Sequence, residues 1–85
     1  MPTIEQTIRG FVVDNFLFGE SNREPGGEES FLELGIIDST GVLELVSFIE
    51  STFGLKVADA ELVPDNLDTV NSLVTFIRRK TGRAD

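Results

Sequence analysis

Apolar residues recur at helical spacing in three stretches of this 85-residue chain, and longer polar or irregular segments separate the stretches. In the first stretch, Thr3 stands at an N-cap position and Gln6 follows three residues later, which is the spacing of a capping box. The pattern predicts a helix over about residues 3–18, with Gly19 as its stop. The expected core positions of this helix are Ile4, Ile8, Phe11 and Val12.

The second stretch predicts a helix over about residues 39–53. Asp38 is suited to cap its first turn, and Gly54 is suited to end it. One face of this helix is apolar and is expected to enter the core: Val42, Leu45, Val46, Ile49 and Phe53. The other face is expected to be exposed and consists of Thr40, Glu44, Ser47 and Ser51, with Glu50 on one flank near Leu43.

The third stretch predicts a last helix over about residues 69–81, with Asp68 as its N-cap and Gly82 at its end. Basic side chains in its last turn would complement the negative end of the helix dipole, and these are Arg78, Arg79 and Lys80. The expected core positions are Val70, Leu73, Val74 and Ile77.

The connections differ in character. The polar, glycine-rich part at 19–30 has no apolar anchor, so we expect a disordered loop there. Residues 31–37 are apolar but have no partner strand, which favours a buried connection held by Phe31, Leu34 and Ile37. Residues 55–67 have irregular apolar spacing, so we expect one short helix within 58–67. The whole chain, residues 1–85, is therefore expected to be a single all-α domain, a small bundle of three main helices and a short one, with a long loop over residues 19–38.

The composition excludes several functions. The chain has no Cys and no His, so it lacks thiolate metal ligands, a Cys nucleophile and an imidazole base, and we expect no catalytic residues and no metal site. The net charge of −8 argues against nucleic-acid binding. Residues 1–77 carry fourteen acidic and three basic side chains; such a surface either is simply well solvated or attracts basic partners. Neither a membrane span nor a signal peptide is evident, which favours a cytoplasmic monomer.

Ser39 is the strongest candidate for a residue with a chemical function. It follows the expected cap Asp38 at the start of a helix, where an attached anion such as a phosphodiester would be favoured. A serine at this place commonly serves only as part of a helix cap. The chain offers no group to activate its hydroxyl, so any reaction at Ser39 would need another enzyme.

These residues resemble the acyl carrier family, whose members carry acyl, aminoacyl or peptidyl groups on 4′-phosphopantetheine. The matching residues are Leu34-Gly35-x-x-Asp38-Ser39, Glu44-Leu45-Val46, Ile49-Glu50 and Phe53-Gly54. The order of a first helix, a long loop, the Asp-Ser helix, a short third helix and a last helix matches as well. The resemblance implies a covalent 4′-phosphopantetheine on Ser39, beside Asp38, installed by a phosphopantetheinyl transferase. Its terminal thiol would hold the cargo as a thioester.

The resemblance also implies that Asp38, Glu44 and Glu50 meet basic partner surfaces, together with Thr40, Leu43 and Ser47 on the same helix. Thr40 and Ser47 replace the Leu and Met that are common in fatty-acid carriers, and Gly41 replaces an acidic residue. These differences favour a discrete carrier in a specialised pathway, such as secondary metabolism. Its expected partners are adenylate-forming acyl or aminoacyl ligases, or acyl-transfer and synthase enzymes. The alternative is an acidic helical adaptor in which Ser39 is only a cap.

Overall fold

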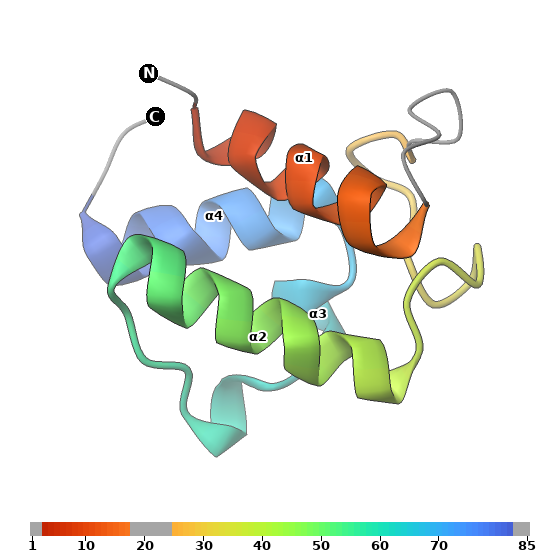
Figure 1. The fold of residues 1–85 in the computed structure, drawn as a ribbon. Coiled ribbons are helices and arrows are strands. Elements are labelled where there is room, and N and C mark those ends of the chain that lie inside the picture. Colours follow the sequence, from red (N-terminus) through yellow and green to blue (C-terminus); the bar gives the residue numbers. More distant parts are fainter. Residues whose placement is uncertain (1–2, 18–24, 83–85) are drawn as a thin grey trace.

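Three long helices surround a shared apolar core (Figure 1). The computed structural model describes residues 3–17 and 25–82. In these segments the chain forms, in order, α1 (Ile4–Phe16), α2 (Ser39–Phe53), the 3-10 turn η2 (Asp59–Glu61), α3 (Pro64–Leu67) and α4 (Val70–Thr81), and no strand. The predicted all-α class, with three main helices and a short third helix, is confirmed.

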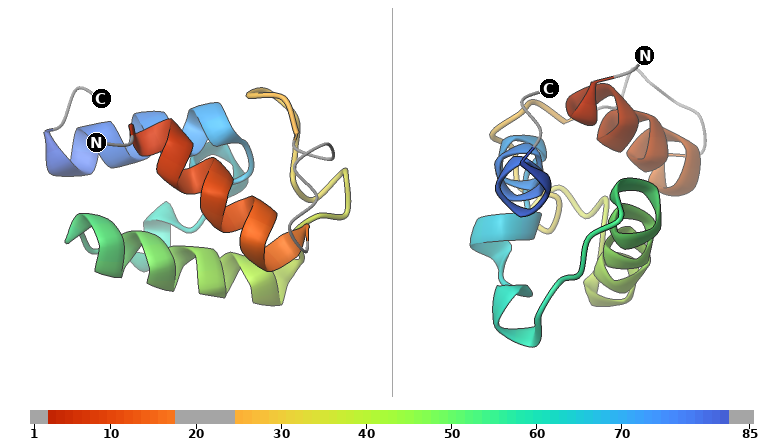
Figure 2. Two further views of the ribbon diagram at one scale, coloured as in Figure 1. Left: turned by 45° about the horizontal axis from the view of Figure 1, so that its top comes forward. Right: turned by 90° about the vertical axis from the view of Figure 1, so that its left-hand side faces the viewer.

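The end-on view in Figure 2 shows how the elements are arranged. The helices α1, α2 and α4 occupy three corners, and η2 and α3 lie on the side between α2 and α4. The core is built from buried residues of all three long helices, including Ile8 of α1, Ile49 of α2 and Phe76 of α4. None of the helices in the described segments has the length and apolar character that crossing a bilayer requires.

Local hydrogen bonds start the first two helices where the sequence predicts. The Gln6 amide donates to Thr3 Oγ1 at 3.1 Å, and the Thr3 amide donates to Gln6 Oε1 at 2.9 Å, which completes the capping box. At the start of α2, the Gly41 amide donates to Asp38 Oδ1 at 2.7 Å. Gly54 ends α2 with a φ of 68°, a left-handed conformation that glycine adopts without strain. The predicted stop of the first helix at Gly19 lies outside the described residues.

The predicted cap of the last helix is wrong by one residue. Thr69, not Asp68, is the N-cap of α4, and its Oγ1 accepts a hydrogen bond from the Ser72 amide at 3.0 Å. The Asp68 carboxylate instead accepts hydrogen bonds from Ser30 and Leu32, which lie far away in the sequence. A long-range contact has therefore replaced the local cap.

The long connection is more ordered than its composition suggests. Pro25 is buried and its carbonyl accepts a hydrogen bond from Arg9 Nη1 at 2.8 Å. The Gly27 carbonyl accepts one from the Asn71 amide of α4 at 3.0 Å. The expectation of disorder is thus wrong for residues 25–30, while residues 19–24 lie outside the described part of the chain.

The apolar run that follows was predicted to be held by three buried side chains, and one of these is wrong. Phe31 and Ile37 are buried, but Leu34 is 47% exposed. The chain folds into successive turns here, with the Leu34 amide bonded to the Ser30 carbonyl and the Gly35 amide to the Leu32 carbonyl, both at 3.1 Å. These turns direct one side of the segment toward solvent.

The segment between α2 and α4 contains two short helical turns, η2 and α3, where we expected one. Pro64 occupies the first turn of α3, where its missing N–H has no cost. Leu55 and Leu67 are the buried residues that hold this segment to the core.

Tight packing explains why glycine stands in the first turn of α2. Gly41 is buried, and a Cβ there would lie 2.9 Å from Ile37 Cγ2 and 2.9 Å from Phe16 Cε1. Both distances are well below normal carbon contacts. The absent side chain therefore lets the end of α1 approach the start of α2.

We predict opposite effects for two Gly-to-Ala changes. Gly41→Ala should lower the free energy of unfolding by about 1–3 kcal/mol, because the crowding outweighs the better helix propensity of alanine. Gly10→Ala in α1 is the matched control: a Cβ there has no neighbour within 4 Å, so it should raise stability by about 0.5–1 kcal/mol. Urea unfolding measures both; a stabilised Gly41→Ala protein would contradict the packing argument.

Candidate functional site

The predicted attachment residue stands at the start of the longest helix. Ser39 is the first residue of the fifteen-residue α2, directly after the N-cap Asp38. Asp38 is exposed, and its Oδ1 accepts a hydrogen bond from the Gly41 amide at 2.7 Å. The amides of this first turn and the positive end of the helix dipole favour a negatively charged group at this place. A phosphodiester on Ser39 fits these surroundings.

Four of the predicted partner residues form one exposed stripe on α2. Thr40, Leu43, Glu44 and Ser47 are all exposed, and their spacing of three, four and seven residues from Thr40 places them on one face of the helix. Leu43 is 62% exposed, which is unusual for a large apolar side chain in so small a domain. The structure thus brings these four residues together beside the start of α2.

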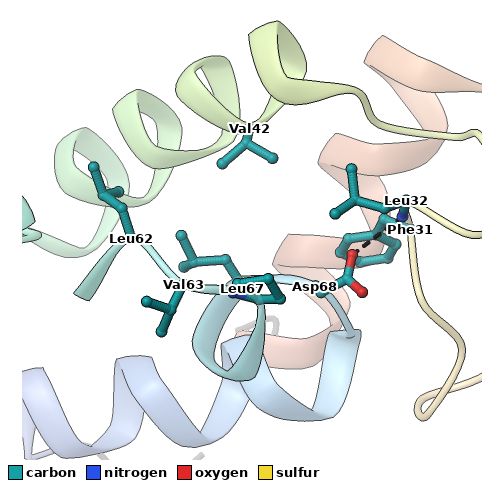
Figure 3. A pocket seen from close by; sticks show the side chains of 8 residues that line it. Phe31, Leu32, Val42, Leu62, Val63, Leu67 and Asp68 are labelled. Atoms are coloured by element: carbon teal, nitrogen blue, oxygen red, sulfur yellow. Dashed lines mark hydrogen bonds between the residues drawn. The ribbon is translucent and has the colours of Figure 1, made fainter. Parts of the chain in front are cut away.

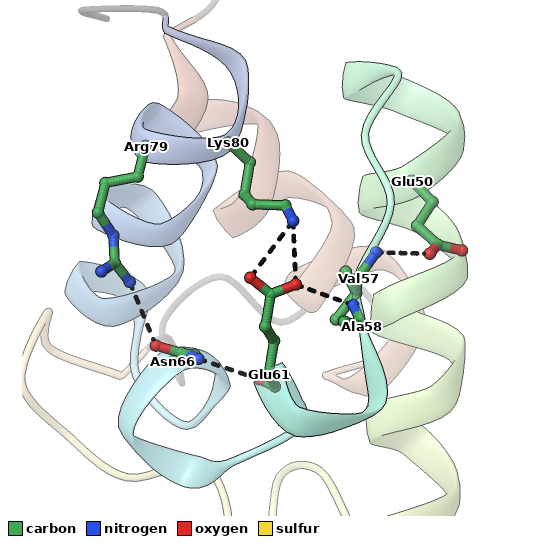
Figure 4. Close-up of polar contacts among 7 residues, drawn as sticks. All are labelled: Glu50, Val57, Ala58, Glu61, Asn66, Arg79 and Lys80. Atoms are coloured by element: carbon green, nitrogen blue, oxygen red, sulfur yellow. Dashed lines mark hydrogen bonds and ion pairs between the residues drawn. The ribbon is translucent and has the colours of Figure 1, made fainter.

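Glu50, the remaining predicted partner residue, has a different environment. Its side chain is half-buried, and its Oε2 accepts a hydrogen bond from the Val57 amide at 2.9 Å (Figure 4). This bond holds the chain that leaves α2 against the helix it has just completed. Glu50 therefore has a structural role that the sequence did not indicate.

A small apolar pocket is bounded on one side by α2 (Figure 3). It has a volume of about 190 Å³. Val42 of α2, one helical turn after Ser39, forms one wall. The complete lining is Phe31, Leu32, Val42, Leu62, Val63, Pro64, Leu67 and Asp68. Sequence reasoning missed this pocket because its walls come from three separate segments; the irregular apolar spacing of residues 55–67 was the only hint.

The pocket and the helix start together suit a pantetheine arm. The N-terminus of α2 favours the phosphate, and the apolar lining one turn away can shelter uncharged atoms. In the described residues no group of three or more acidic, His or Cys side chains converges in a way that could hold a metal ion.

Polar contacts hold η2 and α3 against α4 (Figure 4). Glu61 Oε1 accepts hydrogen bonds from the Ala58 amide at 2.8 Å and from Lys80 Nζ at 3.0 Å. The Ala58 N–H, and next the Lys80 ammonium, lower the pKa of the Glu61 carboxyl from its ordinary value. Asn66 links the same elements, since its Nδ2 donates to the Glu61 carbonyl at 3.1 Å and its Oδ1 accepts from Arg79 at 3.4 Å.

Comparison with known proteins identifies the class. Residues 17–77 match the family described as "Phosphopantetheine attachment site", and the match includes Asp38 and Ser39. The chain belongs to this family, so it is a carrier protein with a covalent 4′-phosphopantetheine rather than an enzyme or a simple adaptor. Such a carrier interacts with a phosphopantetheinyl transferase and with enzymes that handle acyl groups.

Similar proteins indicate which kind of carrier this chain resembles. The chain is 38% identical over 72 residues to the D-alanyl carrier protein of Streptococcus pyogenes serotype M5 (strain Manfredo), and equally to those of serotype M49 (strain NZ131) and serotype M1. Each alignment covers 85% of this chain and 87% of the relative. A specialised aminoacyl carrier role fits this similarity.

The contacts of Glu61 with Ala58 and Lys80 predict how its pKa should change when Lys80 is replaced. In Lys80→Gln, the pKa of Glu61 should rise but stay below its ordinary value, because the Ala58 N–H still donates. Arg78→Gln, which removes the same charge from the same helix turn, should leave the pKa of Glu61 nearly unchanged. Carboxyl ¹³C NMR titration measures both variants.

The lowered pKa of Glu61 means that its ionised carboxylate stabilises the folded state. The folded state binds its proton at Glu61 less readily than the unfolded chain does. This contribution to stability is complete above the unfolded pKa and is lost as the pH falls through the folded pKa. An unchanged pKa of Glu61 in Lys80→Gln would show that the ion pair is not formed in solution.

Proposed function

We propose that Ser39 carries the 4′-phosphopantetheine and that the cargo is a small aminoacyl group. The observation that carries this proposal is the position of Ser39 as the first residue of α2, with Asp38 capping the helix, inside the segment that matches the family. When bound, the group supplies the thiol that this Cys-free chain lacks and holds the cargo as a thioester.

The residues of the chain would act by placement rather than by chemistry. Asp38 fixes the first turn of α2 through the Gly41 amide, so that the residue to be modified is presented on an ordered helix end. We propose that the transferase supplies the base that removes the hydroxyl proton of Ser39, because the chain has no His and Asp38 is engaged in capping α2.

The size of the pocket supports a small cargo. A cavity of about 150 Å³ holds one benzene-sized molecule, so a pocket of about 190 Å³ has room for a short group. The D-alanyl carrier relatives point the same way. We therefore propose loading by a stand-alone adenylate-forming aminoacyl ligase, with D-alanine as the first amino acid to test.

Partner enzymes would approach the exposed stripe of α2. Asp38 and Glu44 offer negative charge, Leu43 offers an apolar contact, and Thr40 and Ser47 offer hydroxyls. Glu50 would add charge at the far end of the stripe while it holds Val57. We propose that the carrier works as a monomer in the cytoplasm, where coenzyme A and ATP are available, and that it does not bind nucleic acid, since its charge is −8.

The attachment prediction is tested with the full-length protein, coenzyme A, magnesium and a promiscuous phosphopantetheinyl transferase. The native chain should gain the mass of one phosphopantetheine, and Ser39→Ala should gain nothing. Ser51→Ala, another exposed serine of α2 that lies outside the partner stripe, should be modified like the native chain. Intact mass and peptide mapping give the answer, and modification of Ser39→Ala would refute the assignment.

The partner surface is tested by charge reversal. Glu44→Lys should lower kcat/KM for phosphopantetheine transfer roughly three- to tenfold at low salt, because a basic partner surface would be repelled. Asp59→Lys in η2 makes the same change in net charge and should have a much smaller effect. Equal losses in both variants would mean that only the net charge matters, and added salt should reduce the difference between them.

A further inference from the structure

One residue at the junction of α3 and α4, Asp68, holds three consecutive residues of the long connection through its side chain and its main chain. The Asp68 carboxylate accepts hydrogen bonds from the Ser30 hydroxyl through Oδ2 and from the Leu32 amide, at 3.1 Å, through Oδ1. The main-chain carbonyl of Asp68 accepts a hydrogen bond from the Phe31 amide at 2.8 Å. Asp68 thus joins segments that are 36 to 38 residues apart in the sequence.

The segment held in this way leads directly to the attachment residue. Phe31 is buried, and its carbonyl accepts hydrogen bonds from the amides of Ile36, at 3.0 Å, and Ile37, at 3.5 Å. Ile37 is followed by the cap Asp38 and by Ser39. A continuous series of contacts therefore runs from the main chain of Asp68, through Phe31, to the residues that enter α2. The Asp68 carboxylate holds the two residues on either side of Phe31, Ser30 and Leu32.

The same contacts build one end of the pocket. Figure 3 shows Asp68 beside Leu32 and Phe31, all three in the lining. Leu32 is 47% exposed, so the hydrogen bond to its amide, rather than burial of its side chain, fixes its position. Asp68 is not needed to start α4, because Thr69 is the N-cap.

We propose that Asp68 is a positioning residue for the modification of this carrier: it holds Ser30–Leu32 so that the start of α2 and the pocket are already arranged when the transferase arrives. The proposal rests on the proposed attachment at Ser39. Without the carboxylate, the connection would sample several arrangements, and only a fraction of the molecules would be ready to bind. A smaller competent fraction raises the apparent KM and leaves kcat largely unchanged.

Two substitutions separate geometry from charge. In Asp68→Asn, the amide oxygen can still accept from the Leu32 amide, and the amide nitrogen can donate to the Ser30 oxygen. Asp68→Ala keeps neither bond. If Asp68 acted through its charge on a basic partner, Asn would be as harmful as Ala; if it acts by position, Asn should largely restore the function.

The experiment measures kcat and KM for phosphopantetheine transfer to the full-length apo protein. We expect Asp68→Ala to raise KM roughly five- to tenfold, as the loss of two hydrogen bonds suggests, with kcat changed less than about twofold. Asp68→Asn should stay within about twofold of the native protein. Asp65→Ala, a neighbouring exposed acid in α3, is the matched control and should behave as native.

Amide hydrogen exchange supplies a second readout. The Leu32 and Ile36 amides should exchange faster in Asp68→Ala, while the core amides of α1 and α4 keep their protection. If Asp68→Ala does not fold, Ser30→Ala is the variant to measure. It removes the bond to the Asp68 carboxylate and the bond that the Glu33 amide donates to Ser30 Oγ. It keeps the bond between Asp68 and the Leu32 amide, so it should raise KM by a smaller factor.

Three results would overturn the proposal: a native KM in Asp68→Ala, equal defects in Asp68→Asn and Asp68→Ala, or a fall in kcat with an unchanged KM. These results differ from a failure of the proposed function. If Ser39 is not the attachment residue, the native protein will be modified elsewhere or not at all, whatever residue stands at position 68.

Discussion

The burial of one face of α2 is the constraint on which the rest of the structure depends. Leu45 and Ile49 are completely buried in the core, and Phe48 stacks on Phe11 of α1 with 4.0 Å between the ring centroids. These contacts fix the rotation of the helix about its axis. The stripe of Thr40, Leu43, Glu44 and Ser47 must then face solvent, so a requirement of the core determines which face of α2 is exposed.

The start of α2 depends on segments that are distant in the sequence. Phe16, near the end of α1, packs on the first turn where Gly41 lacks a side chain, and Asp68, just before α4, holds the connection that enters the helix. A carrier needs its attachment residue to be accessible, yet an isolated helix end frays readily. Support from both neighbouring segments holds the first turn of α2 in place.

The division of roles between chain and cofactor follows from the composition. The chain has no Cys, and the cofactor of its family supplies the thiol. Two glutamate side chains make polar contacts that hold the segment between α2 and α4 in place. Glu50 holds Val57, and Glu61 joins Ala58 to Lys80, so the segment that lines the pocket is held in place between α2 and α4.

Periodicity and capping are local properties, so the amino-acid pattern was enough to predict the three long helices, the caps Thr3, Asp38 and Gly54, and the position of Ser39 at a helix start. The features that join distant segments emerged only in the folded chain. Leu34 is exposed although it is apolar, Asp68 binds the long connection instead of capping α4, and the pocket takes its walls from three segments. Local patterns cannot predict these features, since each depends on which segments meet in the folded chain.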